Sequence, residues 1–298
     1  MKSSLLILGA AAVLLVVGVV YFIAGKAPST DQRTKAAVAA TIYPLYDIAR
    51  NVAGEDAEVK LILPPGASPH LFEFSPKQLE GLQNAREVFA IGHGLDDWAA
   101  QVASVAKDAR VIVVDRGIEL RKFENGAIDP HYWLHLGNAR QIADNIAKSL
   151  AEVDPEHAEA YRARSDAYKM KLSEKERELK EVLTSAQGKP ILTFHDAWFY
   201  FAGNFGLTIA GTFEPAAGEE PTPRYLAALR QEIGEKRIRI IFVEPQLSTA
   251  VLESFAEDNH LSVAELDPLG GVEGRKTYLE LMEFNANSIR RALEKKGP

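Results

Sequence analysis

The chain has 298 residues, of which 47% are hydrophobic and 25% are charged, and its formal net charge is −7. This length suggests two domains of ordinary size, and the hydrophobic fraction excludes wholesale disorder. The acidic balance argues against a nucleic-acid-binding protein. The chain contains no Cys, which excludes disulfides, thiolate metal sites, cysteine nucleophiles and lipid attachment to a cysteine. Any chemistry must therefore use His, carboxylates, hydroxyls or the backbone.

The N-terminal segment is the most apolar part of the chain. Residues 5–25 carry no charge, and Lys2 and Lys26 flank them. At 1.5 Å per residue, a helix of this length crosses a bilayer core of about 30 Å. A secretory signal usually has a shorter apolar core, of about 7–15 residues. We therefore expect residues 1–27 to be a membrane anchor rather than a cleaved signal segment, and residues 28–36 to be a tether to an extracytoplasmic part, in the periplasm or at the cell surface.

Short apolar runs alternate with amphipathic stretches in the rest of the chain. Strands are expected at residues 37–42, 59–63, 88–91, 111–114, 191–194, 207–212, 240–243 and 263–266. Ser75-Pro76 and Thr222-Pro223 each predict a helix start, because a hydroxyl residue caps the first turn and Pro fits the first helical position. Such alternation predicts mostly parallel sheets flanked by helices.

The middle of the chain has a different pattern. Asp154-Pro155 predicts a helix cap and a first turn. Helix-forming residues then run to about Ala186, and Gly188 ends the run. The apolar positions are too irregular for a sustained coiled coil. We therefore expect an α/β fold of two lobes, each with a four-stranded mostly parallel sheet flanked by helices, joined by one long backbone helix. The expected parts are an N-terminal lobe at 37–153, a linking helix at 154–187 and a C-terminal lobe at 188–298.

Four side chains with metal-binding chemistry follow expected strands or precede a helix. His70 lies in a loop after a strand, and His195 and Asp267 each follow a strand directly. His131 lies just before a helix, behind a Pro. In open parallel sheets, ligands bind at the carboxyl ends of the strands. One such residue alone would be a surface or turn residue, but four placements, two in each lobe, predict a site between the lobes. Three imidazoles and a carboxylate suit zinc first and lack the all-oxygen set of calcium or magnesium.

The motifs that contain these residues resemble those of a known family. In chain order they are TIYPLYDIARNVAG, PPGASPHLFEFSPKQLEGL, DPHYWL, TFHDAWFYFAGNFGL, EPTPRYLAAL, FVEPQLS and ELDPLGG. In this order and spacing, over roughly residues 37–293, the chain resembles the zinc/manganese-type (cluster A-I) solute-binding proteins of ABC importers. The resemblance implies a metal site of His70, His131, His195 and Asp267. Zinc members carry His where many manganese members carry Glu at position 195, so the resemblance favours Zn²⁺, with Mn²⁺ or iron as the alternative.

The chain also departs from the family pattern. Many zinc members carry a loop rich in His and Asp between the first two ligands, where this chain has LRKFENGAIDP. His135 is four residues after His131, so a helix would bring both to one face and make His135 a further candidate ligand. His93 could approach the rim of the cleft or be a solvated loop residue, and Glu244 could support the site or form an unrelated salt bridge. The two histidines expected at the surface are His157 and His260.

The resemblance implies capture of a metal ion without catalysis. We expect an extracytoplasmic monomer that binds a divalent transition metal, zinc first, and delivers it to an ABC transporter permease. The main rival is an extracytoplasmic zinc hydrolase or lyase, but the chain has no HExxH pair, no Gly-x-Ser-x-Gly elbow and no Gly-rich phosphate loop. A fourth protein ligand would also close the metal shell. A third possibility is an adhesion or scaffold protein in which the metal is structural.

Overall fold

The computed structural model describes residues 35–123, 125–215, 218–247 and 250–294. The predicted anchor at 1–27 lies outside these residues, as does the tether up to residue 34. Within the described part of the chain, no helix is both long enough and apolar enough to cross a membrane. The chain from residue 36 onward falls in one compact unit.

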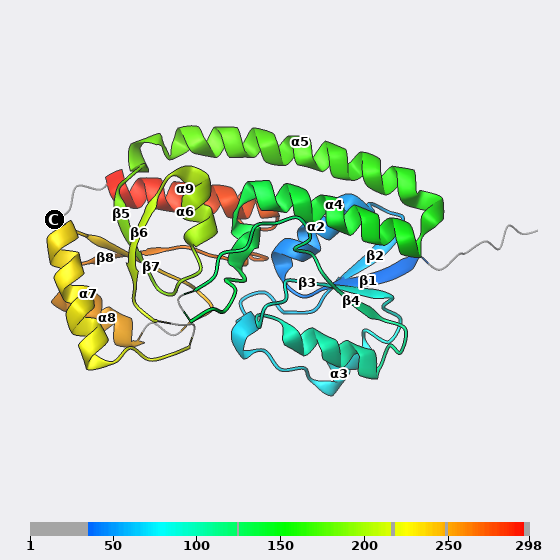
Figure 1. The fold of residues 1–298 in the computed structure, drawn as a ribbon, viewed down its shortest axis with the longest axis horizontal. Helices are drawn as coiled ribbons and strands as arrows, with labels where there is room; N and C mark the ends of the chain where they lie inside the picture. The colour runs from blue at the N-terminus through cyan, green and yellow to red at the C-terminus, as the bar shows by residue number, and fades with distance from the viewer. Residues whose placement is uncertain (1–34, 124, 216–217, 248–249, 295–298) are drawn as a thin grey trace, which may run out of the picture. The chain divides into compact units, whose positions relative to one another are not determined.

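Two four-stranded parallel sheets form the frame of this unit (Figure 1). The strand order is β2-β1-β3-β4 in the first sheet and β6-β5-β7-β8 in the second. The strands are β1 Ala36–Ala40, β2 Ala57–Leu61, β3 Glu87–Ala90, β4 Arg110–Val113, β5 Pro190–Thr193, β6 Thr208–Thr212, β7 Ile240–Val243 and β8 Ser262–Glu265. Every predicted strand is present within two residues of its predicted bounds, and the predicted two-lobed α/β fold is confirmed.

Helical segments connect the parallel strands, as such ladders require, and a further helix follows β8. The α-helices are α2 Tyr43–Ala53, α3 Pro76–Glu80, α4 Leu136–Val153, α5 Ala158–Val182, α6 Phe199–Phe205, α7 Pro223–Lys236, α8 Ala250–Asp258 and, after β8, α9 Tyr278–Glu294. The predicted caps are present: the side chain of Ser75 accepts from the Gln78 backbone N–H at the start of α3, and that of Thr222 accepts from the Tyr225 backbone N–H at the start of α7. Helix α5 runs alongside α4 and α9 and so spans both sheets (Figure 1).

The linking helix α5 is shorter than the sequence suggests. Its ends are separate 3₁₀ turns at Pro155–His157 and Thr184–Ala186. Asp154 does not act as the predicted cap, because its side chain has other partners. Its Oδ2 accepts from the Tyr161 hydroxyl at 2.6 Å and lies 2.7 Å from Nδ1 of His157. The carboxylate therefore ties the turn to the first part of the helix instead of satisfying the first backbone N–H groups.

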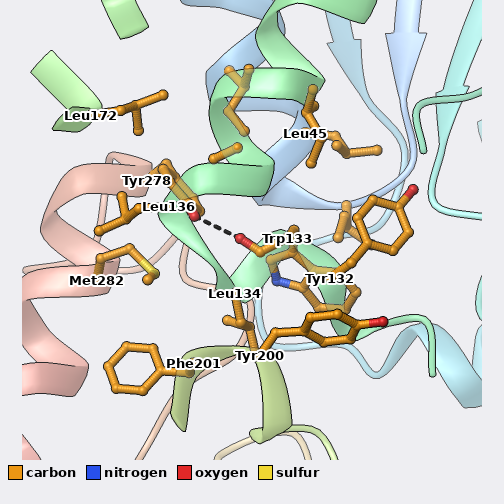
Figure 2. Packing of buried hydrophobic residues seen from close by; sticks show 14 of the residues in the cluster. Leu45, Tyr132, Trp133, Leu134, Leu136, Leu172, Tyr200, Phe201, Tyr278 and Met282 are labelled. Atoms are coloured by element: carbon orange, nitrogen blue, oxygen red, sulfur yellow. Dashed lines mark hydrogen bonds between the residues drawn. The ribbon is translucent and has the colours of Figure 1, made fainter. Parts of the chain in front are cut away.

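One hydrophobic cluster runs through both lobes. Figure 2 shows Trp133 and Leu134, from the 3₁₀ turn His131–Leu134, beside Tyr278 and Met282 of α9. The Tyr278 hydroxyl donates to the Trp133 carbonyl at 2.6 Å (Figure 2), and the Trp133 indole N–H donates to the Pro268 carbonyl at 2.8 Å. The two lobes therefore share one core and are not separate hydrophobic bodies.

The loop that leads into α9 is held by α2 of the first lobe. The Tyr43 hydroxyl donates to the Lys276 carbonyl at 2.6 Å, and Asp47 Oδ2 accepts from the Tyr278 backbone N–H at 2.9 Å. Gly271 has a φ of +81°, and a Cβ there would lie 2.6 Å from the Tyr43 ring, so only glycine fits this contact. The loop belongs to the second lobe by sequence but is anchored on both lobes.

Candidate metal centre

Three of the four predicted ligands meet in space. His70 lies in the 3₁₀ turn Pro69–Leu71, His131 begins the turn before α4, and His195 lies just beyond the carboxyl end of β5. One ring nitrogen from each lies within 4.8 Å of the others. The Nε2 atoms of His131 and His195 are 3.4 Å apart. Two nitrogens bound tetrahedrally to one zinc at 2.0–2.1 Å are separated by about 3.4 Å, so this pair already has a suitable spacing.

Local contacts fix the turns that carry His70 and His131. A Pro precedes each of these residues and restricts the backbone there. The Trp98 indole N–H donates to the Pro69 carbonyl at 3.0 Å, and the Tyr132 hydroxyl donates to the Ile91 carbonyl at 2.9 Å. Pro69, beside His70, and Tyr132, beside His131, are therefore each hydrogen-bonded to another residue of the first lobe.

Carboxylates stand behind two of the imidazoles. Asp129 Oδ1 lies 2.9 Å from His131 Nδ1 and accepts from the His131 backbone N–H at 3.0 Å. Glu244 Oε1 lies 2.8 Å from His195 Nδ1 and accepts from the Trp198 indole at 3.1 Å. A carboxylate at Nδ1 favours a proton there and leaves the Nε2 lone pair for a metal. Both Nε2 atoms of the close pair are thus available as ligands.

An arginine connects the two carboxylate-backed segments. Arg121 Nη1 and Nη2 donate to Asp196 at 2.9 and 2.7 Å, and Nη1 also donates to Asp129 Oδ2 at 3.2 Å. Arg121 was not among the predicted site residues. The acid two residues before His131 and the acid directly after His195 were visible signals, but no sequence spacing indicates that Arg121 lies between them.

The pKa values of His70 and His195 are shifted in opposite directions. Burial, together with the neighbouring imidazoles, lowers the pKa of His70 from 6.5 to about 3. Burial also acts to lower the pKa of His195, but the Glu244 carboxylate outweighs it and the net direction is upward. At neutral pH His70 is therefore neutral and ready to bind a metal. The raised pKa of His195 extends upward in pH the range in which a proton competes with the metal for that imidazole.

Asp267 does not join the group of three imidazoles. Its Oδ1 accepts from the Gln246 side chain at 2.7 Å and from the backbone N–H groups of Leu269 and Gly270 at 2.9 and 3.0 Å. Its Oδ2 is buried, receives no hydrogen bond from a described residue and lies 3.2 Å from Arg275 Nη1. The turn after β8 thus uses one oxygen to order its own backbone. Asp267 as a ligand stays a prediction, and Oδ2 is the atom that would bind.

The other sequence candidates lie in different places. His135 is not on one helical face with His131, because the helix α4 begins only after it. Its Nδ1 caps α4 by accepting from the Gly137 backbone N–H at 2.9 Å. His93 lines the same cavity as the three imidazoles. It therefore lies nearer to the site than a solvated loop residue would. The two histidines predicted at the surface are indeed there: His157 keeps 44% of its side chain exposed, and His260 is exposed.

A cavity of about 580 Å³ opens over the imidazoles. Its wall includes Arg121, Asp196 and the loop of His93. The cavity is far larger than a metal ion, so an ion can enter it with bound water. The three nitrogens are therefore accessible from outside, although His131 and His195 are buried.

Comparison with known proteins decides the family. A family model described as the periplasmic zinc-uptake complex component A, ZnuA, matches residues 38–292. The chain belongs to this family. The resemblance stated from the sequence motifs is confirmed.

Two relatives and one solved structure are similar to this chain. The manganese-binding lipoprotein MntA of Halalkalibacterium halodurans is 28% identical over 252 residues, which cover 82% of this chain and 84% of MntA. The zinc-binding protein AdcA of Streptococcus pyogenes is 26% identical over 286 residues, which cover 86% of this chain and 56% of AdcA. A crystal structure of ZnuA has a TM-score of 0.78 and 28% identity, and the match covers 87% of this chain and 99% of that one. The relatives are named for different metals, so the metal preference of this chain must be argued from its own site.

Proposed function

We propose that this protein captures a divalent transition metal outside the cytoplasm and delivers it to the permease of an ABC importer. The observation that carries the proposal is the group of His70, His131 and His195, whose ring nitrogens lie within 4.8 Å of one another. Membership of the ZnuA family supports the same function. The apolar residues 5–25 serve as the membrane anchor in this proposal, and the protein acts as a monomer.

Zinc is the preferred metal in this proposal. Imidazole nitrogen suits zinc, whereas manganese favours carboxylates, carbonyls and water. The centre offers three imidazoles, and the single additional acid, Asp267, already uses one oxygen in its own turn. Asp267 Oδ2 would complete a tetrahedral shell if it left Arg275, which is 3.2 Å away.

Two rival functions receive less support. A zinc hydrolase needs an open metal position with a carboxylate aimed at the bound water. The carboxylates nearest the imidazoles, Asp129 and Glu244, lie against the Nδ1 atoms, behind the rings and away from the Nε2 pair. An adhesion protein with a structural metal would need the ion for its fold, but the apolar core here includes none of the three histidines. A mild chelator should therefore remove the ion and leave the circular dichroism of a folded chain.

Calorimetric titration tests the proposed function. We expect the metal-free full-length chain to bind one zinc ion per molecule and to prefer zinc over manganese. His195→Ala should weaken zinc binding by more than ~100-fold, since it removes a ligand where the loss of a supporting group alone costs about 10–100-fold. The matched control is His157→Ala, which removes an exposed imidazole away from the cavity. Equal affinity in His195→Ala and the native chain would refute the site.

A further inference from the structure

One histidine on the cavity wall has no role in the proposed centre. His93 lies between two glycines and has a φ of +59°. A left-handed backbone is uncommon for a residue with a side chain and persists only where the surroundings hold it. Its ring lines the same cavity as His70, His131 and His195, and 18% of its side chain is exposed. His93 is therefore part of the wall that an ion in the cavity can contact.

Buried contacts hold the loop of His93 in place. The Asp96 carboxylate accepts from the backbone N–H groups of Ile91 and Gly92 at 2.8 and 2.7 Å and from the Thr41 hydroxyl at 2.5 Å. The Tyr132 hydroxyl donates to the Ile91 carbonyl at 2.9 Å. Tyr132, which follows the candidate ligand His131, is thus hydrogen-bonded to Ile91, directly after β3 and just before the loop of His93.

His93 has the same type of partner as two of the ligands. Its Nε2 lies 2.8 Å from Asp115 Oδ2, as the Nδ1 atoms of His131 and His195 lie against Asp129 and Glu244. A carboxylate at one ring nitrogen makes the other a better metal ligand. For His93 that other atom is Nδ1, to which no described residue hydrogen-bonds.

The charge near the cavity favours a cation. The wall contains one arginine, Arg121, but its guanidinium is paired with both Asp196 and Asp129. Asp115 adds a further negative charge behind His93. The carboxylates of Asp196, on the wall, and of Asp129 and Asp115, behind it, thus outnumber the guanidinium of Arg121. Such an excess of negative charge concentrates cations and raises their rate of association.

We propose that His93 is a transfer ligand, which takes up the incoming divalent ion through Nδ1 and passes it to the centre of His70, His131 and His195. The inference rests on the proposed function. The exchange needs neither a proton nor an electron: one bound water leaves the ion when Nδ1 binds, and Nδ1 leaves when an imidazole of the centre takes its place. A single imidazole binds weakly, as a transfer ligand must. Because His93 is absent from the final shell, its removal slows binding and release by the same factor and leaves the dissociation constant unchanged.

Stopped-flow kinetics with zinc and the full-length chain test this inference. We expect His93→Gln to lower both the association and the dissociation rate constants by roughly 10-fold, with an unchanged calorimetric dissociation constant. The control is His157→Gln, because His157 also has a carboxylate partner, Asp154, at 2.7 Å but lies away from the cavity. Asp115→Asn keeps the His93 ring and removes the charge behind it, so it should slow both rates in the same direction but by less.

The outcomes separate the two proposals. Rate constants of His93→Gln equal to those of the native chain would overturn the transfer role. A faster dissociation with a weaker dissociation constant would also overturn it, since that marks a ligand or support of the final site. If His93→Gln fails to fold, native rates in Asp115→Asn would refute the role instead. A native chain that binds no zinc would refute the proposed function, whereas native binding with unaffected variants would refute only the transfer role.

Discussion

His131 and His195 each place one ring nitrogen against a carboxylate and keep the other for a metal. The carboxylates of Asp129 and Glu244 favour a proton on the two Nδ1 atoms, and the Nε2 atoms lie 3.4 Å apart. His70 has a different environment, in which burial lowers its pKa to about 3. The centre therefore combines one imidazole that resists protonation with one whose pKa is raised.

The support that Glu244 gives to His195 can be tested with one substitution. Glu244→Gln keeps the shape of the side chain but removes the charge that orients His195, so we expect zinc affinity to fall about 10–100-fold. Calorimetric titration measures the change. Glu235→Gln, on the exposed side of α7, is the control and should bind as the native chain does. Native affinity in Glu244→Gln would show that His195 does not need this partner.

The low pKa of His70 predicts acid sensitivity in the metal-free chain. Unfolded His70 binds a proton near pH 6.5, whereas the folded residue stays neutral down to about pH 3. Between these values the unfolded state holds more protons, so the free energy of unfolding falls as the pH falls. Urea denaturation at several pH values should show a shallower decline for His70→Gln than for the native chain. His260→Gln is the control, and an equal slope for His70→Gln and the native chain would contradict the prediction.

The turn His131–Leu134 and the helix α9 are two of the elements that join the lobes. Trp133 bonds to the Pro268 carbonyl through its indole and receives the Tyr278 hydroxyl on its own carbonyl. The same turn begins with a candidate ligand. Packing between the lobes and the position of His131 therefore depend on one short segment.

Tyr278→Phe removes the hydroxyl from this junction. The buried Trp133 carbonyl then loses its donor, which costs about 1–2 kcal/mol, so we expect a lower free energy of unfolding in urea. Tyr46→Phe is the matched control, because no described residue hydrogen-bonds to the Tyr46 hydroxyl. A free energy of unfolding equal to the native value would mean that the Trp133 carbonyl finds another partner.

Elements determined by local patterns could be predicted from the sequence, whereas contacts formed only in the fold could not. Strands such as Ile240–Val243 could be predicted because continuous apolar runs are typical of buried parallel strands. The helix start at Ser75-Pro76 could be predicted because capping depends on neighbouring residues only. Asp154 was wrongly predicted as a cap, since the partner that takes its side chain, Tyr161, is visible only in the fold. The position of Asp267 was predictable, but its pairing with Arg275 was not, because turn geometry after β8 decides it.

On the scale of the whole molecule, the core is continuous between the lobes. The cluster that contains Trp133 and Tyr278 extends from α2 to α9, and α5 packs on helices of both lobes. Relative motion of the lobes would have to break these contacts, because packed interiors do not deform continuously. Metal capture should thus involve the loops of the ligands rather than a wide swing.

Small-angle X-ray scattering tests this expectation. We expect the same radius of gyration for the metal-free chain and for the chain with saturating zinc, since closure is confined to loops such as that of Asp267. Zinc binding should be verified in the same sample by metal analysis. A clear contraction on zinc binding would contradict the shared-core argument.

The anchoring of α9 on α2 has a consequence for synthesis. A chain made from its N-terminus completes the strands of the first lobe long before residues 278–294 exist, yet α2 and Trp133 lack part of their packing until then. Part of the apolar surface of the first lobe therefore stays exposed until α9 emerges. Truncation within α9 would therefore damage the distant N-terminal half, and folding would become cooperative only when the last helix is released.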